Sequence, residues 1–162
     1  LSSELAQKVR DREIDVAIIT DAEITLPDCR SQLICKEPLQ ILAPKSVTET
    51  SQTEILNKHP FIWFDRRTWA GNQIEKHLSE LRVHVKPVME ISALAAIEAL
   101  VENEIGISIV PKPVGAKPYS DKIKVFDFGS PPKFRKLVMI DRENNPRASI
   151  CDALYSELCK LV

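Results

Sequence analysis

The sequence contains few cysteines and histidines, and their spacing does not match that of a metal site or a catalytic motif. The 162 residues include four cysteines and three histidines. No two cysteines form a C-x-x-C pair, and the histidines stand apart from them, whereas structural zinc sites use closely spaced ligands. We therefore expect no metal site. Cys29 and Cys35 could form a redox pair, but nothing nearby marks either thiol as activated.

Recognised catalytic motifs do not occur in the sequence either. It contains no G-x-S-x-G elbow, no G-x-x-x-x-G-K-[ST] loop and no H-E-x-x-H pair, and it has only four glycines to shape a phosphate-binding loop. Glu90 and Glu98 could serve as an acid–base pair, but no nucleophile accompanies them, so two exposed carboxylates are the better interpretation. We expect a protein that is not an enzyme and uses no cofactor.

One polar cluster follows the apolar run at residues 61–64 and could bind a ligand. It consists of Asp65, Arg66, Arg67, Thr68 and Trp69. An arginine can bind a carboxylate through two parallel hydrogen bonds, but adjacent side chains usually point apart, so we expect at most one arginine at a common site. Two solvated surface arginines are an equally good interpretation. Thr68 could cap a helix, contact a ligand or do both, and Trp69 is more typical of a packing anchor.

Short apolar runs and apolar residues at helical spacing predict the elements that position this cluster. Residues 61–64, 88–91 and 107–110 have the length and composition of buried strands. Apolar residues at helical spacing after Thr68 and again after Ser92 predict a helix in each interval. The order strand, helix, strand, helix, strand is a complete βαβαβ unit, which requires parallel strands with helices on both faces of the sheet.

The segments at residues 1–44 and 119–162, on either side of this unit, contain two predicted helices and four predicted extended segments. They lie at residues 1–11, 14–19, 33–43, 123–128, 136–140 and 150–161. We predict an α/β fold of two Rossmann-like lobes, each a parallel sheet with helices on both faces. Residues 45–118 form lobe two. Residues 1–44 and 119–162 form lobe one, which is incomplete because no strand precedes its opening helix.

Two helix starts carry capping signals. Ser51 and Glu54 have the spacing of a capping box, which predicts a short helix to about Asn57. Ser92 is the predicted N-cap of the helix that follows it. Both serines are therefore expected to accept a hydrogen bond from a backbone amide of the first helical turn.

The predicted sheet also selects candidate ligand-binding residues. In an open parallel sheet, ligands bind beyond the carboxyl ends of the strands, where helix N-termini present free amides and a positive dipole end. Besides the cluster at residues 65–69, this rule selects Thr20, Asp21, Ser92, Pro111 and Lys112.

Composition and charge narrow the classes of partner. The 22 basic and 23 acidic residues leave a net charge of −1, so no global field attracts nucleic acid or an anionic membrane. No apolar run approaches the roughly 20 residues needed to cross a bilayer, and residues 1–10 lack the order of a secretory signal. We expect a cytoplasmic protein that has no membrane partner and could contact DNA only through another segment.

An ordered set of short phrases resembles the effector-binding domain of LysR-type transcriptional regulators. The phrases are D-V-A-I-I at residues 15–19, E-P-L at 37–39, A-P at 43–44, P-F-I at 60–62, A-I and L-V at 96–97 and 100–101, and G-I-S-I-V-P at 106–111. No single phrase is diagnostic. Their order and spacing, over nearly all of the 162 residues, carry the resemblance.

The resemblance implies both a fold and a function. It implies two lobes that hold a small-molecule effector in the cleft between them, with a DNA-binding domain and the first strand–helix–strand of lobe one lying outside this sequence. The effector is expected to be a carboxylate or an amino acid. The domain is expected to be a homodimer that contacts its partner through residues 1–11 and 68–91, and the full-length protein a higher oligomer. The family pattern has a helix-ending glycine where Glu104 stands, so Asn103 is expected to adopt the left-handed conformation instead.

A solute-binding protein of a transport system shares the two-lobe architecture and is the alternative function. A helix-turn-helix in the full gene would favour regulation, and a signal peptide would favour transport.

Overall fold

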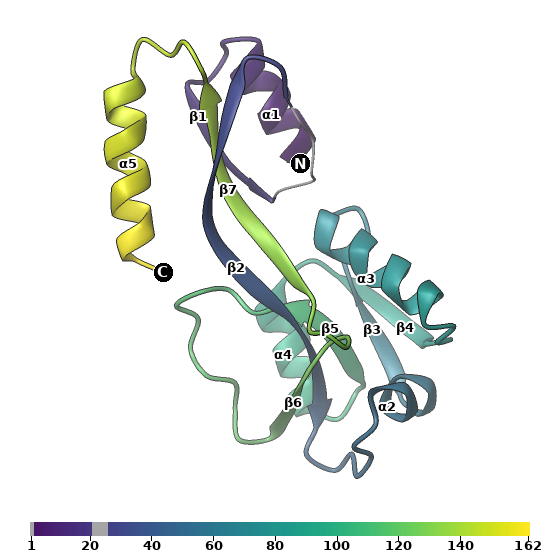
Figure 1. The fold of residues 1–162 in the computed structure, drawn as a ribbon. Helices are drawn as coiled ribbons and strands as arrows, with labels where there is room; N and C mark the ends of the chain where they lie inside the picture. Colours follow the sequence, from purple (N-terminus) through teal and green to yellow (C-terminus); the bar gives the residue numbers. More distant parts are fainter. Residues whose placement is uncertain (1, 21–25) are drawn as a thin grey trace. The chain divides into compact units, whose positions relative to one another are not determined.

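The computed structural model of the chain describes residues 2–20 and 26–162 and contains two compact units. Unit 1 comprises Leu1–Glu37 and Arg135–Val162, and unit 2 comprises Pro38–Phe134. Figure 1 shows the chain crossing between the units twice, within β2 (Cys29–Pro44) and at the start of β7 (Phe134–Arg142).

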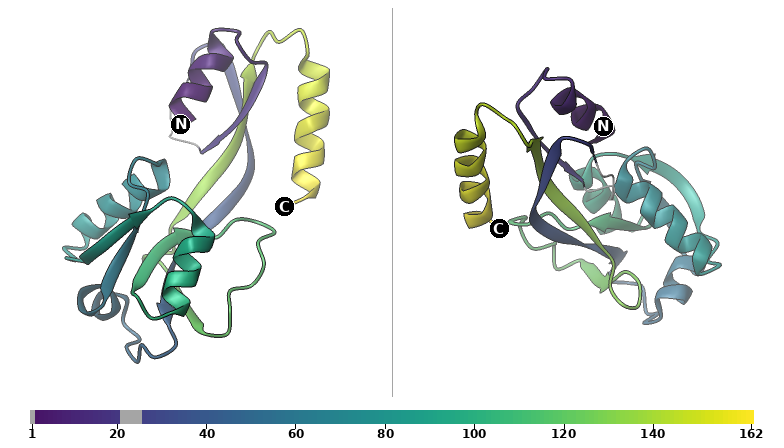
Figure 2. Two further views of the ribbon diagram at one scale, coloured as in Figure 1. Left: turned by 180° about the vertical axis from the view of Figure 1, so that it is seen from behind. Right: turned by 45° about the horizontal axis from the view of Figure 1, so that its top comes forward.

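Unit 2 contains the predicted βαβαβ arrangement. Its elements are β3 (Pro60–Phe64), α3 (Trp69–Glu80), β4 (Lys86–Ile91), α4 (Leu94–Glu102) and β5 (Ile107–Pro111). The central strand β3 pairs in parallel with β4 on one side and with β5 on the other. Right-handed crossovers in opposite directions place the two helices on opposite faces of the sheet, as Figures 1 and 2 show for α3 and α4.

Because helices cover both faces of the sheet, its inner strands are buried. Every residue of β5 and all but the first of β3 are buried, as expected for parallel strands with helices on both faces. By contrast, β4 is an edge strand with five exposed residues. The largest fully buried side chains of unit 2 are Leu39, Ile41, Leu42, Ile55, Leu56, Phe61, Ile62, Ile74, Ile97, Ile107, Ile109 and Phe128.

Antiparallel strands complete the sheet of unit 2. Residues of β2 pair antiparallel with β5 on one side and with β6 (Ile123–Asp127) on the other, and α2 (Gln52–Lys58) precedes β3. The predicted parallel pairing therefore holds for β3, β4 and β5 and not for the strands that enter from outside the βαβαβ arrangement.

Unit 1 combines three strands with two helices. Its elements are α1 (Ser2–Arg10), β1 (Val16–Thr20), the first half of β2, most of β7 and α5 (Ala148–Lys160). One hydrophobic cluster packs α1 against the sheet through Ala6, Val9, Ala17, Val138 and Ile140. The sheet was predicted to be parallel, but β1 pairs antiparallel with β7. The chain leaves unit 1 along β2 and returns along β7, so no helical crossover sets a parallel direction here.

The residues at which the chain divides into units also differ from the predicted lobe boundaries. Lobe two was predicted at residues 45–118, whereas unit 2 begins at Pro38 and ends at Phe134. Strand pairing explains the difference, because residues 39–44 of β2 bind β5 and β6. Strand β2 passes from one unit to the other without a break, so the apolar pattern of residues 33–43 does not show where the crossing lies.

Three predicted helix-end features differ in the structure. Ser51 is the N-cap residue of α2, but its side chain makes no capping hydrogen bond, and the N-cap of α4 is Ala93, not Ser92. Asn103 has a φ of −94°, and Glu104 takes the left-handed conformation with a φ of 61°.

The end of α4 explains why Glu104 is left-handed. The amide of Ile105 donates to the Leu100 carbonyl at 3.1 Å, and the amide of Glu104 donates to the Val101 carbonyl at 3.0 Å. These two bonds form a Schellman motif, whose geometry requires a positive φ at Glu104. The Asn103 side chain instead donates to the Ala99 carbonyl at 2.8 Å.

The described residues contain no helix that is both long and apolar enough to span a membrane.

Candidate functional site

The polar cluster at residues 65–69 connects the carboxyl end of β3 to the first turn of α3. Thr68 is the N-cap residue of α3: its hydroxyl accepts a hydrogen bond from the Gly71 amide at 3.1 Å and donates one to the Asp65 carbonyl at 2.7 Å. The predicted capping role of Thr68 is therefore confirmed. Both bonds hold the loop against the helix start, which makes its shape well defined.

Gly71 allows the close approach of this loop to α3. A Cβ atom at this position would lie 2.2 Å from the Asp65 carbonyl oxygen and 2.8 Å from the Arg66 Cα. These distances are far shorter than a van der Waals contact, so only glycine fits. The sequence analysis did not single out Gly71, although a glycine in the first turn of a predicted helix is a signal of close backbone contact.

Asp65 is largely buried, and Arg67 surrounds its carboxylate. One carboxylate oxygen accepts from the Arg67 amide and Nε, both at 3.0 Å, and the other accepts from Nη2 at 2.9 Å. These bonds, first of all those from the guanidinium, hold the pKa of the Asp65 carboxyl below its usual value. The Arg67 side chain remains 81% exposed, so it can still contact a ligand.

Arg66 points instead toward β4 and α3. Its amide and Nε donate to the two carboxylate oxygens of Glu90 at 2.9 and 3.1 Å, and its Nη1 lies 3.5 Å from a carboxylate oxygen of Glu75. The guanidinium carbon also lies 5.2 Å from the centre of the Trp63 ring, within the range of a cation–π contact. The two arginines therefore point apart, and Arg66 already has carboxylate partners.

The start of α3 has the electrostatic properties of an anion site. Within the part of the chain that the structure describes, the amides of Trp69 and Ala70 donate no hydrogen bond. Free amides and the helix dipole attract negative charge at such a point. Trp69 is partly buried against the hydrophobic core of unit 2, so packing is its main role here.

The other candidate residues lie at the ends of further strands. Ser92 is exposed in the bend between β4 and α4, and Pro111 is buried at the end of β5, where it pairs with Leu39. Because β3, β4 and β5 are parallel, their carboxyl ends share one edge of the unit 2 sheet. Asp65 is tied to this edge directly, since its amide donates to the Ile91 carbonyl at 3.2 Å.

The three remaining candidates are Lys112, Thr20 and Asp21. The ammonium of Lys112 lies 3.7 Å from the centre of the Tyr119 ring and donates to the Lys117 carbonyl. Thr20 belongs to unit 1, where its amide donates to the Ser2 hydroxyl at 3.2 Å. Asp21 lies outside the described residues.

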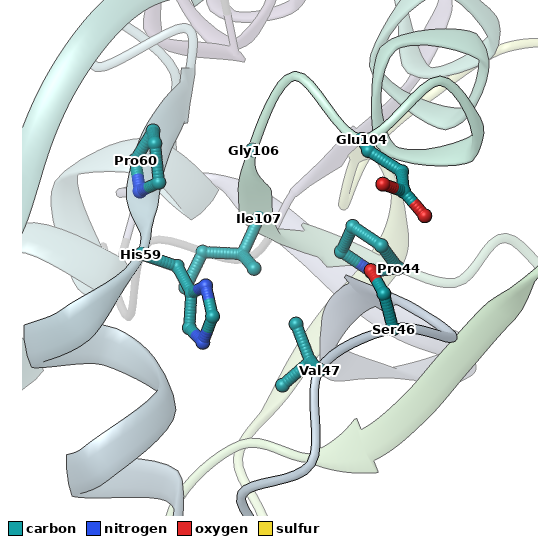
Figure 3. Close-up of a pocket in the computed structure, with 8 residues that line it drawn as sticks. All are labelled: Pro44, Ser46, Val47, His59, Pro60, Glu104, Gly106 and Ile107. Carbon is teal, nitrogen blue, oxygen red and sulfur yellow. The ribbon is translucent and has the colours of Figure 1, made fainter.

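A pocket of about 120 Å³ lies at the opposite end of the unit 2 strands (Figure 3). Its lining residues come from the end of β2, the starts of β3 and β5 and the loops beside them: Pro44, Ser46, Val47, His59, Pro60, Glu104, Gly106 and Ile107. Small-molecule sites usually enclose roughly 300–1,000 Å³. The pocket is therefore too small for a typical effector, and it lies away from the carboxyl ends of the strands.

Comparison with known families decides the class of this chain. The family model described as "LysR substrate binding domain" matches residues 1–158. The chain belongs to this family. A comparison with curated protein sequences finds no match.

Solved structures share the fold of this LysR substrate-binding domain. A full-length OxyR variant from Pseudomonas aeruginosa superposes with a TM-score of 0.78 at 22% identity, covering 99% of this chain and 55% of that one. The effector-binding domain of QuiR in complex with shikimate has a TM-score of 0.72 at 18% identity, covering 98% and 76% of the two chains. The Synechocystis CcmR regulatory domain in complex with 2-PG has a TM-score of 0.77 at 15% identity, covering 99% and 79%. The LysR substrate-binding domain described here thus spans about half the length of the full-length OxyR chain.

In this LysR substrate-binding domain, the described residues contain no group of three or more His, Cys, Asp or Glu side chains placed to hold a metal ion.

Proposed function

We propose that this chain is the small-molecule-sensing domain of a LysR-type transcriptional regulator and that it has no enzymatic activity. The match of the family model to residues 1–158 carries the proposal. Membership of this family favours regulation over solute transport. The carboxylates that could serve as acid or base at the strand ends, Asp65 and Glu90, are both bound by arginines, which fits a binding role better than catalysis.

The proposed effector site lies at the carboxyl end of β3. The Thr68 hydroxyl, the first amides of α3 and the exposed Arg67 guanidinium together favour a small anion, such as a carboxylate or an amino acid. The QuiR structure was solved with shikimate, which is a carboxylate. Thr20, Ser92 and Pro111 remain predicted effector contacts from the other strand ends.

A thermal-shift screen tests the proposal. The wild-type chain is heated with small carboxylates, amino acids and phosphorylated acids, each at a concentration far above a micromolar dissociation constant. A ligand at a hundred times its dissociation constant stabilises the folded state by about 2.7 kcal/mol, which raises Tm by roughly 5–10 °C for a chain of this length. The proposal fails if no acid in the screen shifts Tm.

We also propose that the domain forms a homodimer and contacts DNA only through another part of the regulator. Edge strand β4 exposes Val88 and Met89, the end of α3 exposes Leu81 and α1 exposes Leu5, so apolar surface is available at both predicted contact regions. Light scattering at high concentration tests the dimer, and a monomer there would contradict it. Footprinting with this chain alone should protect no operator, because its basic and acidic residues are balanced.

A further inference from the structure

Two of the four cysteines lie where α5 packs along β2 in unit 1. Cys35 is on β2 and Cys159 is near the end of α5, and both are free thiols of intermediate exposure. Cys151 is buried, with its sulfur 3.4 Å from the Asn145 side-chain amide. Cys29 packs against the α1 cluster.

Two polar contacts set the alignment of α5 on β2. The Arg30 guanidinium donates to the Asp152 carboxylate at 2.6 Å, and the Tyr155 hydroxyl donates to the Leu33 carbonyl at 2.7 Å. Going from the first contact to the second advances the chain along both elements, so α5 and β2 run in the same direction, as Figure 1 shows.

This alignment places Cys35 and Cys159 at corresponding positions along β2 and α5. Cys159 is one helical turn beyond Tyr155, an advance of about 6 Å, and Cys35 is two residues beyond Leu33, an advance of about 6.6 Å along the strand. Electrostatics agree with this placement. The pKa of Cys35 is raised by burial and, to a lesser degree, by Glu37 and by Cys159, while Arg135 opposes the rise. The pKa of the Tyr155 hydroxyl is likewise raised, first of all through its interaction with the Cys159 side chain.

Cysteine pairs on a single element are excluded by distance. A disulfide requires Cα atoms within about 7 Å of each other. Cys29 and Cys35 are six residues apart on one continuous strand, which separates them by about 20 Å. Cys151 and Cys159 are eight residues apart on one helix, or about 12 Å. The redox pair of Cys29 and Cys35 considered from the sequence is therefore ruled out.

We propose that Cys35 and Cys159 form a thiol modification site that reacts with low-molecular-weight disulfides to give an intramolecular disulfide. One cysteine thiolate attacks a sulfur of the small disulfide, which forms a mixed disulfide and releases one small thiolate. The second cysteine thiolate then attacks the protein sulfur of the mixed disulfide and releases the other small thiolate. The cysteine pair loses two electrons, the small disulfide gains them, and the two thiol protons end on the two small thiols.

The surroundings of Cys35 set the pH dependence of this reaction. Because its pKa is raised, only a small fraction of Cys35 is thiolate at neutral pH. The charged groups that act on it are Glu37, which raises the pKa, and Arg135, which lowers it. Disulfide formation should therefore accelerate as the pH increases from 7 toward 9, by up to roughly tenfold per pH unit.

The disulfide would join the last turn of α5 to β2 shortly before the chain passes from Glu37 to Pro38, where unit 2 begins. Oxidation would thus restrain unit 1 at one of the two chain crossings. This inference does not depend on the identity of the effector.

Oxidised glutathione is the probe that tests the site. The wild-type chain is incubated with it at increasing ratios to reduced glutathione, alkylated and analysed by intact mass and by a non-reducing tryptic map. The expected product has lost two hydrogen atoms, carries no glutathione and links the Cys35 peptide to the Cys159 peptide. Mixed disulfides alone, no oxidation, or a link between other cysteines would overturn the proposal.

Matched variants distinguish the reaction of Cys35 and Cys159 from reactions of the other two cysteines. The double variant Cys29→Ala/Cys151→Ala keeps only Cys35 and Cys159 and should form the same disulfide as the wild type. Cys35→Ser and Cys159→Ser should each lose the intramolecular link and retain a glutathione on the remaining partner. A link that persists in either serine variant would contradict the assignment. If the double variant does not fold, the wild-type peptide map decides.

Discussion

The amide and the guanidinium of Arg66 bind both carboxylate oxygens of Glu90, at 2.9 and 3.1 Å. Arg66 thus connects the loop after β3 to the edge strand β4, and its guanidinium lies between the carboxylates of Glu90 and Glu75. The neighbouring Arg67 is the more exposed of the two and lies beside the N-cap Thr68. This division separates the two arginines that the sequence left equivalent.

Arg67→Ala should weaken binding of a carboxylate effector by roughly tenfold or more, because a charge-assisted hydrogen bond is lost. Arg66→Ala is the matched control and should change the affinity by less than about threefold, since its partners are Glu90 and Glu75. Calorimetric titration with an effector found by thermal shift measures both. Equal losses in the two variants would contradict this assignment.

Thr68→Val should reduce the free energy of unfolding by about 1 kcal/mol, because it removes the side-chain cap of α3. Ser51→Ala provides the comparison, since the Ser51 side chain makes no capping bond at the start of α2 and should change stability much less. Thr68→Ser should remain close to the wild type. Urea unfolding of the three variants tests the difference, and a similar loss in Thr68→Val and Ser51→Ala would show that the cap contributes nothing measurable.

Gly71→Ala should destabilise the chain by more than about 2 kcal/mol. Helix propensity alone predicts the opposite sign, a gain of about 1 kcal/mol, because alanine favours a helix over glycine. The Cβ of alanine would meet the Asp65 carbonyl oxygen at 2.2 Å, so the loop after β3 would have to move. Denaturant unfolding gives the sign directly, and unchanged or increased stability would mean that the loop relaxes without cost.

Glu104→Gly should stabilise the chain by about 1 kcal/mol, since glycine adopts a positive φ without the strain of a side chain. Glu104→Gln removes the charge but keeps the Cβ atom, so it should give no comparable gain. Thermal and urea unfolding of both variants distinguish backbone strain from charge. An equal gain in Glu104→Gln would assign the effect to the carboxylate.

Acid should destabilise the chain in part through Glu49. A hydrogen bond from its own backbone amide, followed by bonds with His59 and Lys58, lowers the pKa of Glu49 from 4.5 to about 2. The unfolded state therefore binds the proton first, and the stabilisation is complete above about pH 4.5 and is lost as the pH falls toward 2. The urea midpoint should decrease over this window, and Glu49→Gln should decrease less steeply. A parallel pH profile in the variant would contradict the pKa shift.

The sequence alone determined the elements of unit 2 and their class. The apolar run at residues 61–64 and the helical spacing after Thr68 are local patterns, and a βαβαβ order permits essentially one handedness of crossover, so parallel pairing followed without coordinates. The cap at Thr68 was also predictable, because the residues that form it are three positions apart. The family resemblance depended on short phrases in order, which is again sequence information.

Tertiary structure decided the features that join residues far apart in the chain. Arg66 binds Glu90 from the next strand, and Tyr155 of the last helix donates to the Leu33 carbonyl of β2, because strand pairing and helix packing bring these segments together. The boundary at Pro38 lies inside a continuous strand that changes pairing partners, and the apolar pattern of residues 33–43 predicts a single extended segment there. Such relationships depend on contacts over long sequence separations, which local propensity and spacing do not encode.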